Sequence, residues 1–170
     1  YTPILLDGLK ERGVKATFFL MGQNIEGNEE IVKRMSDEGH LIGNHTYSHV
    51  QLTAVSEAEA LAEVEKDSRL IESITGETVA YIRPPYGSVT ESLTEKLNLR
   101  IVLWDIDPRD WESQNTSLVV KHILNHIKDG EIILLHDIFR SSVEAALQVI
   151  DELTAQGYEF VRVDELGAYE

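Results

Sequence analysis

The chain has 170 residues, of which 42% are hydrophobic and 26% are charged, a composition typical of one soluble globular domain. Acidic residues number 30 and basic residues 15, giving a formal net charge of -15. We therefore expect no nucleic-acid partner, because a phosphate backbone would be repelled. The chain contains no cysteine, which excludes disulfide scaffolds, thiolate metal sites and cysteine nucleophiles.

The hydrophobic pattern predicts helices and strands in alternation. In chain order we expect a helix over residues 1–13, a strand over 15–21, a helix over 29–38, a strand over 41–44, a helix over 56–76, a strand over 79–82, a helix over 88–97, a strand over 100–104, a helix over 116–128, a strand over 131–135, a helix over 141–156 and a strand over 159–161. The first helix places Ile4, Leu5 and Leu9 on one face. Ser56 and Glu59 have the spacing of a capping box at the start of the long third helix.

This alternation indicates an α/β fold in which parallel strands are joined by helical crossovers. An open doubly wound sheet and an incomplete barrel both fit the pattern. Polar clusters at 45–49, 83–87, 107–111 and 136–137 each follow closely on a predicted strand. Barrel enzymes collect their chemistry after several strands, whereas an open sheet binds mainly at one switch point. The sequence therefore favours a distorted, incomplete (β/α) barrel, forming a single domain over residues 1–170.

The first polar cluster places two imidazoles, His45 and His49, four residues apart. On a helical turn the two rings would point the same way, so that both could bind one metal ion. A surface turn without a metal is the alternative explanation.

A second histidine pair, His122 and His126, has the same spacing. The core face of its helix is formed by Val119, Val120, Ile123, Leu124 and Ile127. We therefore expect this second pair to lie on a solvent-exposed flank.

The other clusters each allow a functional and a structural reading. Asp110 is followed by Trp111, whose ring could line a sugar groove or fill the core. His136 ends an apolar strand. In the functional reading, a nearby carboxylate keeps it charged as a general acid, and in the structural reading it is a core residue. The prolines between Arg83 and Gly87 stiffen the loop that contains them. This loop could aim a backbone N–H at an oxyanion, or it could be an ordinary turn.

In order and spacing, these clusters resemble the motifs of the polysaccharide deacetylases, the NodB-like carbohydrate esterases. Residues 45–49 match H-[S/T]-x-x-[H/S], residues 83–87 match R-x-x-Y-G, residues 107–111 match D-x-x-D-W and residues 134–136 match L-x-H. The resemblance implies a distorted, partly open (β/α) barrel. It also implies a hydrolase that deacetylates N-acetylglucosamine units in a polysaccharide such as peptidoglycan or a chitin-type oligomer.

By this resemblance, His45 and His49 bind a divalent metal ion, with zinc as the first choice and cobalt, nickel or manganese as alternatives. Arg83 would hold the catalytic base. Tyr86 would offer its backbone N–H to the oxyanion and would contribute to substrate binding.

The resemblance also assigns roles to the later clusters. Asp110 would orient and charge His136, the general acid. Trp111 would line the sugar groove, and Leu134 would form part of the pocket for the acetate methyl group.

One family motif, T-F-D-D-G, is absent from the chain. In the family it supplies the base aspartate and a third metal ligand, and it lies just before a helix like that of residues 1–13. We expect this motif upstream of Tyr1, because the first helix begins without a cap and the first barrel strand is also missing. If the motif were lost instead, a non-catalytic carbohydrate-binding pseudoenzyme would be favoured.

Two enzyme alternatives stay open. An acetyl-xylan esterase of the same family would need the same metal and oxyanion geometry. A metal-dependent phosphoesterase is disfavoured by the acidic balance and by the absence of lysine from the four clusters.

The resemblance implies a secreted or cell-surface protein, although the sequence shows no targeting segment and no apolar run long enough to span a membrane. The expected partner is a polysaccharide or oligosaccharide, and the oligomeric state is left open, with a monomer compatible with the sequence.

Overall fold

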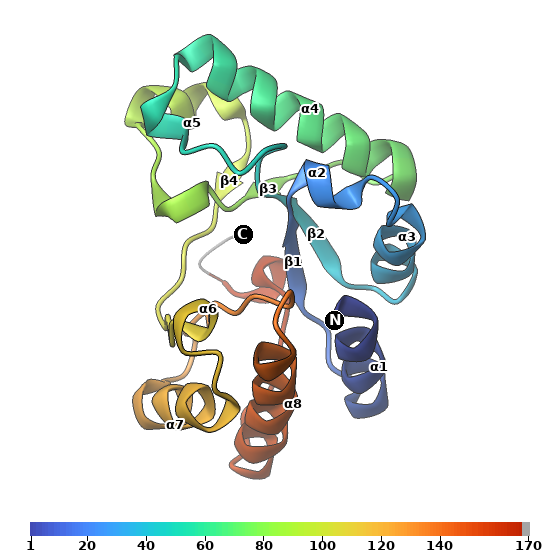
Figure 1. The fold of residues 1–170 in the computed structure, drawn as a ribbon, viewed down its shortest axis with the longest axis vertical. Coiled ribbons are helices and arrows are strands. Elements are labelled where there is room, and N and C mark those ends of the chain that lie inside the picture. The colour runs from blue at the N-terminus through green and yellow to red at the C-terminus, as the bar shows by residue number, and fades with distance from the viewer. Residues whose placement is uncertain (168–170) are drawn as a thin grey trace. The chain divides into compact units, whose positions relative to one another are not determined.

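A parallel sheet organises half of the structure, a computed structural model that describes residues 1–167. Its strands are β1 (Thr17–Leu20), β2 (Leu41–Asn44), β3 (Tyr81–Ile82) and β4 (Arg100–Ile101). The spatial order β1-β2-β3-β4 follows the chain, and every neighbouring pair is parallel. Parallel neighbours require helical crossovers, and Figure 1 shows helices between successive strands. The predicted α/β class is confirmed.

The chain divides into two compact units. The sheet unit consists of Ala16–Leu103 and the chain from Arg162 onward, and the helical unit consists of Tyr1–Lys15 and Trp104–Val161. The predicted single domain over residues 1–170 stays a prediction.

Helices cover the sheet unit and supply its core. They are α2 (Gly22–Ile25), α3 (Glu29–Asp37), α4 (Glu57–Thr75) and α5 (Glu91–Leu97), with short 3-10 turns η1 (Leu52–Ala54), η2 (Pro85–Gly87) and η3 (Val163–Glu165). The predicted cap of α4 is present, since Ser56 Oγ accepts the Glu59 N–H at 3.3 Å. A buried cluster joins α4, α5 and β3 through Leu52, Ala60, Val64, Ile82 and Leu93.

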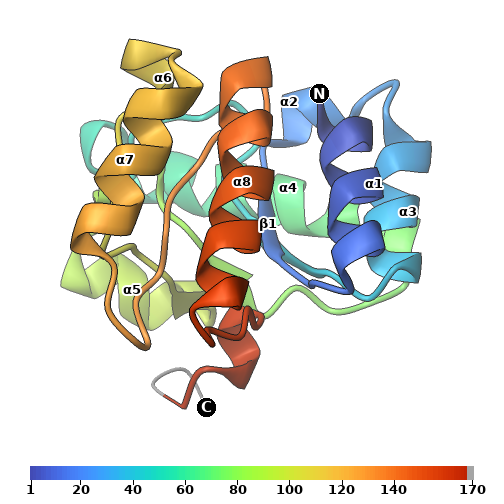
Figure 2. The same cartoon turned by 90° about the horizontal axis from the view of Figure 1, so that it is seen from below.

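The helical unit contains α1 (Thr2–Arg12), α6 (Asp110–Ser113), α7 (Thr116–His126) and α8 (Arg140–Ala155). Figure 2 shows α8 between α7 and α1. The cluster that joins α7 to α8 consists of Ile106, Val119, Val120, Ile123, Ala145, Val149 and Leu153. Arg12 ties α1 to α8 through two hydrogen bonds to Asp151, at 2.7 and 2.8 Å. None of the helices formed by residues 1–167 is both long and apolar enough to cross a membrane.

Several predicted strands are shorter than expected or are not strands. β3 and β4 contain two residues each, and the predicted strand over 131–135 is reduced to one parallel bridge between Ile106 and Ile133. There the Ile132 N–H donates to the Asp105 side chain at 2.8 Å instead of to a backbone carbonyl, which interrupts the ladder. The predicted strand over 159–161 is not a strand in the structure.

The prediction of which side chains of the first helix are buried is also partly wrong. Ile4 is 54% exposed, whereas Leu6 and Leu9 are buried. These two leucines are three residues apart and form the stripe that packs inward. The sequence pattern alone fits either stripe, because apolar residues occupy positions on both.

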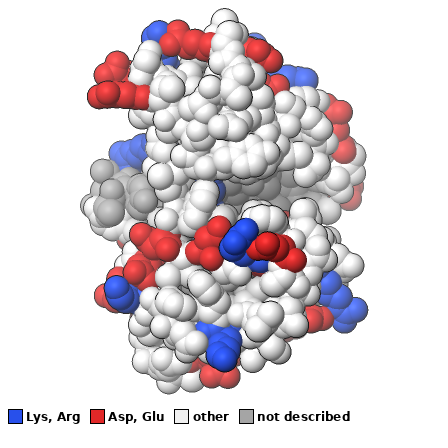
Figure 3. All heavy atoms as spheres, turned by 60° about the vertical axis from the view of Figure 1, so that its left-hand side comes forward, with Lys and Arg blue, Asp and Glu red and all other residues white. Residues whose placement is uncertain are grey.

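One face of the molecule is coloured by charge in Figure 3. Acidic and basic side chains lie in groups along its edges and across its middle, with uncharged surface between the groups. This distribution agrees with the net charge of -15.

Candidate metal and proton-transfer sites

The turn after β2 brings His45 and His49 together. Their ring centroids lie 4.9 Å apart with an interplanar angle of 68°. The expected helical turn is wrong, because Thr46 and His49 adopt left-handed φ angles of 63° and 61°. Two left-handed residues, rather than a helical repeat, therefore turn both rings to one place. Such backbone angles are uncommon outside glycine and persist only where the surroundings hold them.

The buried side chain of Asn44 bonds to this turn and to α4. Its side chain has no exposed surface and donates to the Val64 carbonyl at 2.8 Å and to Ser68 Oγ at 2.9 Å. Its Oδ1 accepts the Thr46 N–H at 2.8 Å. The buried amide therefore links α4 to the first left-handed residue of the turn.

Two carboxyl groups of α4 also accept hydrogen bonds from the turn. Asp67 Oδ2 accepts the His45 N–H at 3.1 Å, and Glu63 Oε2 accepts both the N–H and the hydroxyl of Ser48 at 2.8 Å. Burial raises the pKa of Asp67 to about 8, against the opposing effect of the His45 N–H and with a smaller contribution from the Glu63 charge. Asp67 is therefore largely protonated at pH 7.

The loop after β3 orients the His45 ring. His45 Nδ1 lies 2.5 Å from the Arg83 carbonyl oxygen, and because a carbonyl only accepts, Nδ1 carries the proton. The lone pair of the neutral ring is then on Nε2. A second ring, that of Tyr86, meets His49 edge-on at a centroid distance of 5.1 Å. Tyr86 is itself left-handed, with φ 61°, and its side chain is 67% exposed.

The Arg83 side chain is buried and anchored within the sheet unit. Its guanidinium donates to the Leu103 carbonyl at 3.0 Å and to the Val102 carbonyl at 3.4 Å, and it stacks on the Phe19 ring at 4.4 Å. Phe19 lies over Gly43, where an added Cβ would come within 2.5 Å of the ring. A glycine in β2 thus makes room for the ring that supports Arg83.

These residues fit a divalent metal ion as two of its ligands. The rings are adjacent, and His45 has the backbone-bonded tautomer typical of metal-binding histidines. Catalytic zinc sites commonly use three protein ligands. Within residues 1–167 there is no group of three or more His, Asp or Glu side chains that could hold a metal.

In the helical unit, the two carboxyl oxygens of Asp110 bond to the ring and to the backbone of His136. Asp110 Oδ1 lies 2.8 Å from His136 Nδ1, and its Oδ2 accepts the His136 backbone N–H at 2.7 Å. Asp110 has no exposed surface. Burial by itself would raise the pKa of Asp110, but hydrogen bonds from the His136 ring, the Ser142 side chain and the His136 backbone, together with the charge of His136, outweigh it and lower the pKa below the ordinary value. The ionised carboxylate therefore places a proton on His136 Nδ1.

Two further candidates lie near this pair in the sequence. Trp111 is 45% exposed, with the Arg109 guanidinium 5.4 Å from the centre of its ring. Leu134 is buried, and its N–H donates to the Ile106 carbonyl at 2.9 Å. Their assignment to a sugar groove and an acetate pocket stays a prediction.

The second histidine pair behaves as expected. His122 and His126 are both exposed on α7, with stacked rings 4.5 Å apart. The predicted solvent-exposed flank is confirmed.

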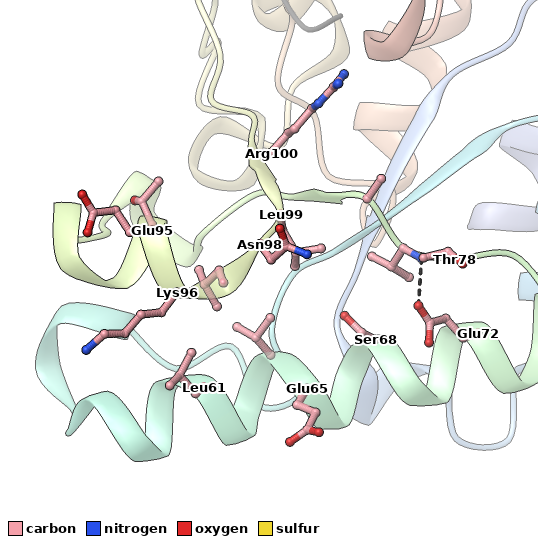
Figure 4. A pocket seen from close by; sticks show the side chains of 15 residues that line it. Leu61, Glu65, Ser68, Glu72, Thr78, Glu95, Lys96, Asn98, Leu99 and Arg100 are labelled. Carbon is pink, nitrogen blue, oxygen red and sulfur yellow. Dashed lines mark hydrogen bonds between the residues drawn. The ribbon is translucent and has the colours of Figure 1, made fainter.

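A separate groove of about 810 Å³ lies in the sheet unit, between α4 and α5. Figure 4 shows Leu61, Ser68 and Glu72 of α4 on one side and the segment from Glu95 to Arg100 on the other. Glu72 Oε1 accepts the Val79 N–H at 3.0 Å. The groove borders the residues that enter β3 and β4, at the opposite ends of the strands from His45 and Arg83.

The comparisons with known proteins decide the family. Residues 1–102 match the sequence model of the family described as polysaccharide deacetylase. The chain belongs to this family. The motif resemblance is thereby confirmed.

Two peptidoglycan deacetylases are among the most similar members of the family. The peptidoglycan-N-acetylmuramic acid deacetylase PdaC of Bacillus subtilis is 40% identical over 162 residues, which are 95% of this chain and 35% of PdaC. The peptidoglycan-N-acetylglucosamine deacetylase PgdA of Listeria monocytogenes is 39% identical over 165 residues, which are 97% of this chain and 35% of PgdA. The chain thus spans about a third of the length of these relatives.

Solved structures of the family share the fold. The structure of PdaC matches with a TM-score of 0.95 and 39% identity, over 99% of this chain and 83% of that chain. This likeness confirms the expected fold class, the incomplete (β/α) barrel of the deacetylase family. BA3943 of Bacillus anthracis, a CE4 family pseudoenzyme, matches with a TM-score of 0.91 and 31% identity, over 98% of this chain and 60% of that chain. The fold by itself therefore does not establish catalysis.

The sequence motifs did not reveal the residues that hold the turn at residues 45–49 (the histidine turn), namely Asn44, Glu63 and Asp67. One signal for Asp67 was available. The buried stripe of α4 consists of Ala60, Val64, Asp67 and Ile71. A carboxyl in an otherwise apolar, core-facing stripe is unusual enough to predict a specific hydrogen-bonding role.

Proposed function

We propose that this chain is the catalytic domain of a metal-dependent peptidoglycan deacetylase, which hydrolyses the acetamide of N-acetylglucosamine or N-acetylmuramic acid units. The observation that carries the proposal is the His45–His49 pair, held at 4.9 Å between ring centroids by a strained turn. The sequence relatives PdaC and PgdA, both peptidoglycan deacetylases, support the substrate class. Action on peptidoglycan also implies a location outside the cytoplasmic membrane.

His45 and His49 would hold the divalent ion, with zinc as the first choice. When bound, such an ion polarises the acetamide carbonyl and makes a water molecule a better nucleophile. The Arg83 carbonyl contributes by fixing the His45 tautomer, so that the ring does not need to exchange protons before it binds the ion.

The loop after β3 would stabilise the charge that develops on the acetamide oxygen. Pro84 and Pro85 are buried, and Tyr86 is held in a left-handed conformation. A rigid loop keeps a backbone N–H in place without reorganisation during the reaction. In this proposal the Tyr86 N–H donates to the oxyanion, and the exposed Tyr86 ring contacts the sugar.

His136 would donate a proton to the departing sugar amine. The Asp110 carboxylate bonds Nδ1, which leaves Nε2 as the atom that transfers the proton. The base that accepts the proton of the attacking water is not among the described residues.

A non-catalytic carbohydrate-binding role is the second candidate. The likeness to the pseudoenzyme BA3943 favours it. The two candidates differ in one measurable product, which is free acetate.

The test is acetate release from N-acetylated glycan fragments of peptidoglycan by the full-length protein. We expect release that a chelator abolishes and that added zinc restores. Release that persists without metal would reject the metal dependence. Glycan binding without acetate release, in metal-loaded protein, would establish the pseudoenzyme instead.

A further inference from the structure

One face of α4 is bonded to Asn44, His45 and Ser48 at the turn after β2. Glu63 and Asp67 are four residues apart and contact Ser48 and His45. Val64 and Ser68 have the same spacing, and both accept hydrogen bonds from Asn44. Residues four apart lie on the same helix face, so a single face of α4 supplies four acceptors to residues 44–48.

The opposite side of the turn is bonded to α2. The N–H groups of Gly22 and Gln23 donate to the carbonyls of Thr46 and Tyr47, at 3.1 and 2.9 Å. An added Cβ on Gly22 would lie 3.0 Å from Asp67 Oδ1 and 2.4 Å from the Tyr47 ring. The turn is therefore confined between backbone donors of α2 and acceptors of α4. Asp67, with no exposed surface, lies at the centre of this contact.

We propose that Asp67 is a positioning residue for the metal-binding histidines, because its Oδ2 fixes the His45 backbone at the start of the left-handed turn. This inference rests on the proposed function. The His45 N–H donates both to the Leu20 carbonyl of β1 at 2.9 Å and to Asp67 Oδ2 at 3.1 Å, so the carboxyl adds a side-chain acceptor where the chain leaves β2. Thr46 and His49 then take the left-handed angles that bring the two rings together. Loss of the acceptor would let the turn relax to commoner backbone angles and separate the rings.

The test compares zinc affinity in three variants of the full-length protein, by competition with a chromophoric chelator. Asp67→Ala and Asp67→Leu both remove the acceptor, and Asp67→Leu also keeps the volume filled. We expect both to weaken zinc binding by roughly 10- to 100-fold, as is typical when an outer partner of a metal ligand is lost. Asp67→Asn keeps an oxygen acceptor and should retain affinity within a few-fold.

A matched control is Glu65→Ala on the same helix, because Glu65 is exposed and pairs with Arg69 instead of the turn. The control should bind zinc like the parent. The electronic spectrum of bound cobalt gives a second readout, and we expect it to change in Asp67→Ala and not in Asp67→Asn. At saturating zinc, Asp67→Ala should recover most of its kcat, since the ligands themselves are intact.

The outcomes separate the two proposals. If folded Asp67→Ala binds zinc as tightly as the parent, the positioning role is rejected and the deacetylase proposal stands. If Asp67→Ala and Asp67→Leu are both unfolded, Asp67 is a structural residue and the inference is again wrong. If the parent protein itself binds no metal, both proposals are rejected.

Discussion

The Nδ1 atom of His136 lies 2.8 Å from Oδ1 of Asp110, a carboxyl group with no exposed surface. Both carboxyl oxygens bond to the same residue, because Oδ2 also accepts the His136 N–H. The ring and backbone of His136 are therefore fixed by one side chain.

His136→Ala should lower the turnover of N-acetylated glycans by roughly 100- to 10,000-fold, as expected for the loss of a general acid. The measurement is the initial rate of acetate release at saturating substrate and zinc. His122→Ala, at an exposed position on α7, is the matched control and should leave the rate unchanged. A loss of less than about threefold in His136→Ala would contradict the assigned role.

Asp110→Asn should reduce stability in a pH-dependent way. The pKa of Asp110 is lower in the folded protein than its ordinary value of 3.8. Its ionised form therefore stabilises the fold above that ordinary value, and the stabilisation is lost as the pH falls through the folded pKa. At pH 7 we expect the variant to lose about 1–3 kcal/mol in the free energy of unfolding, as for a buried, charge-assisted hydrogen bond.

The measurement for Asp110→Asn is urea unfolding at neutral pH and in a series down to about pH 3. The difference between parent and variant should shrink as the pH falls. A difference that stays constant over this range would show that the carboxylate charge is not the source of the stabilisation.

His45→Ala and His49→Ala should each remove most of the bound metal. Each variant loses one of the two proposed ligands, and a single imidazole holds a divalent ion poorly. Metal content measured by atomic emission after gel filtration checks this expectation. His126→Ala is the control, and if it loses as much metal as His45→Ala, the metal lies elsewhere.

Trp111→Ala should raise KM for glycan substrates while leaving kcat nearly unchanged. A ring that stacks on a sugar contributes to binding throughout the reaction, and loss of about 1.4 kcal/mol corresponds to a tenfold rise in KM. The test is a rate-against-concentration curve for the variant. Leu118→Ala removes an exposed apolar side chain of the same unit, which is 59% exposed, and serves as the control. An unchanged KM in Trp111→Ala would place the ring outside the substrate groove.

Local sequence signals predicted those elements whose causes are also local. The helix over 56–76 was placed correctly because Ser56 caps it and Gly76 ends it with a left-handed φ of 76°. The strand over 41–44 was also correct, as was the exposed flank with His122 and His126. In each case, neighbours in the sequence determine the conformation.

Other features depend on residues far apart in the chain, and the sequence pattern did not reveal them. The left-handed angles of Thr46 and His49 are held by groups on α2 and α4, up to 24 residues away along the chain. The apolar run over 131–135 has the pattern of a strand, but Asp105 binds the Ile132 N–H and interrupts the pairing. Motif spacing therefore predicted correctly that the rings of His45 and His49 lie together, but it did not predict the left-handed turn that brings them together.

Arg83 contributes through both its backbone and its side chain, and a substitution would disturb both contributions together. Its carbonyl sets the tautomer of His45, while its guanidinium anchors the same residue to the carbonyls of Val102 and Leu103. Removing the side chain would free the backbone whose oxygen directs the imidazole. An Arg83 variant would consequently lose cation occupancy along with positive charge, so its kinetics should be interpreted only after its metal content has been measured.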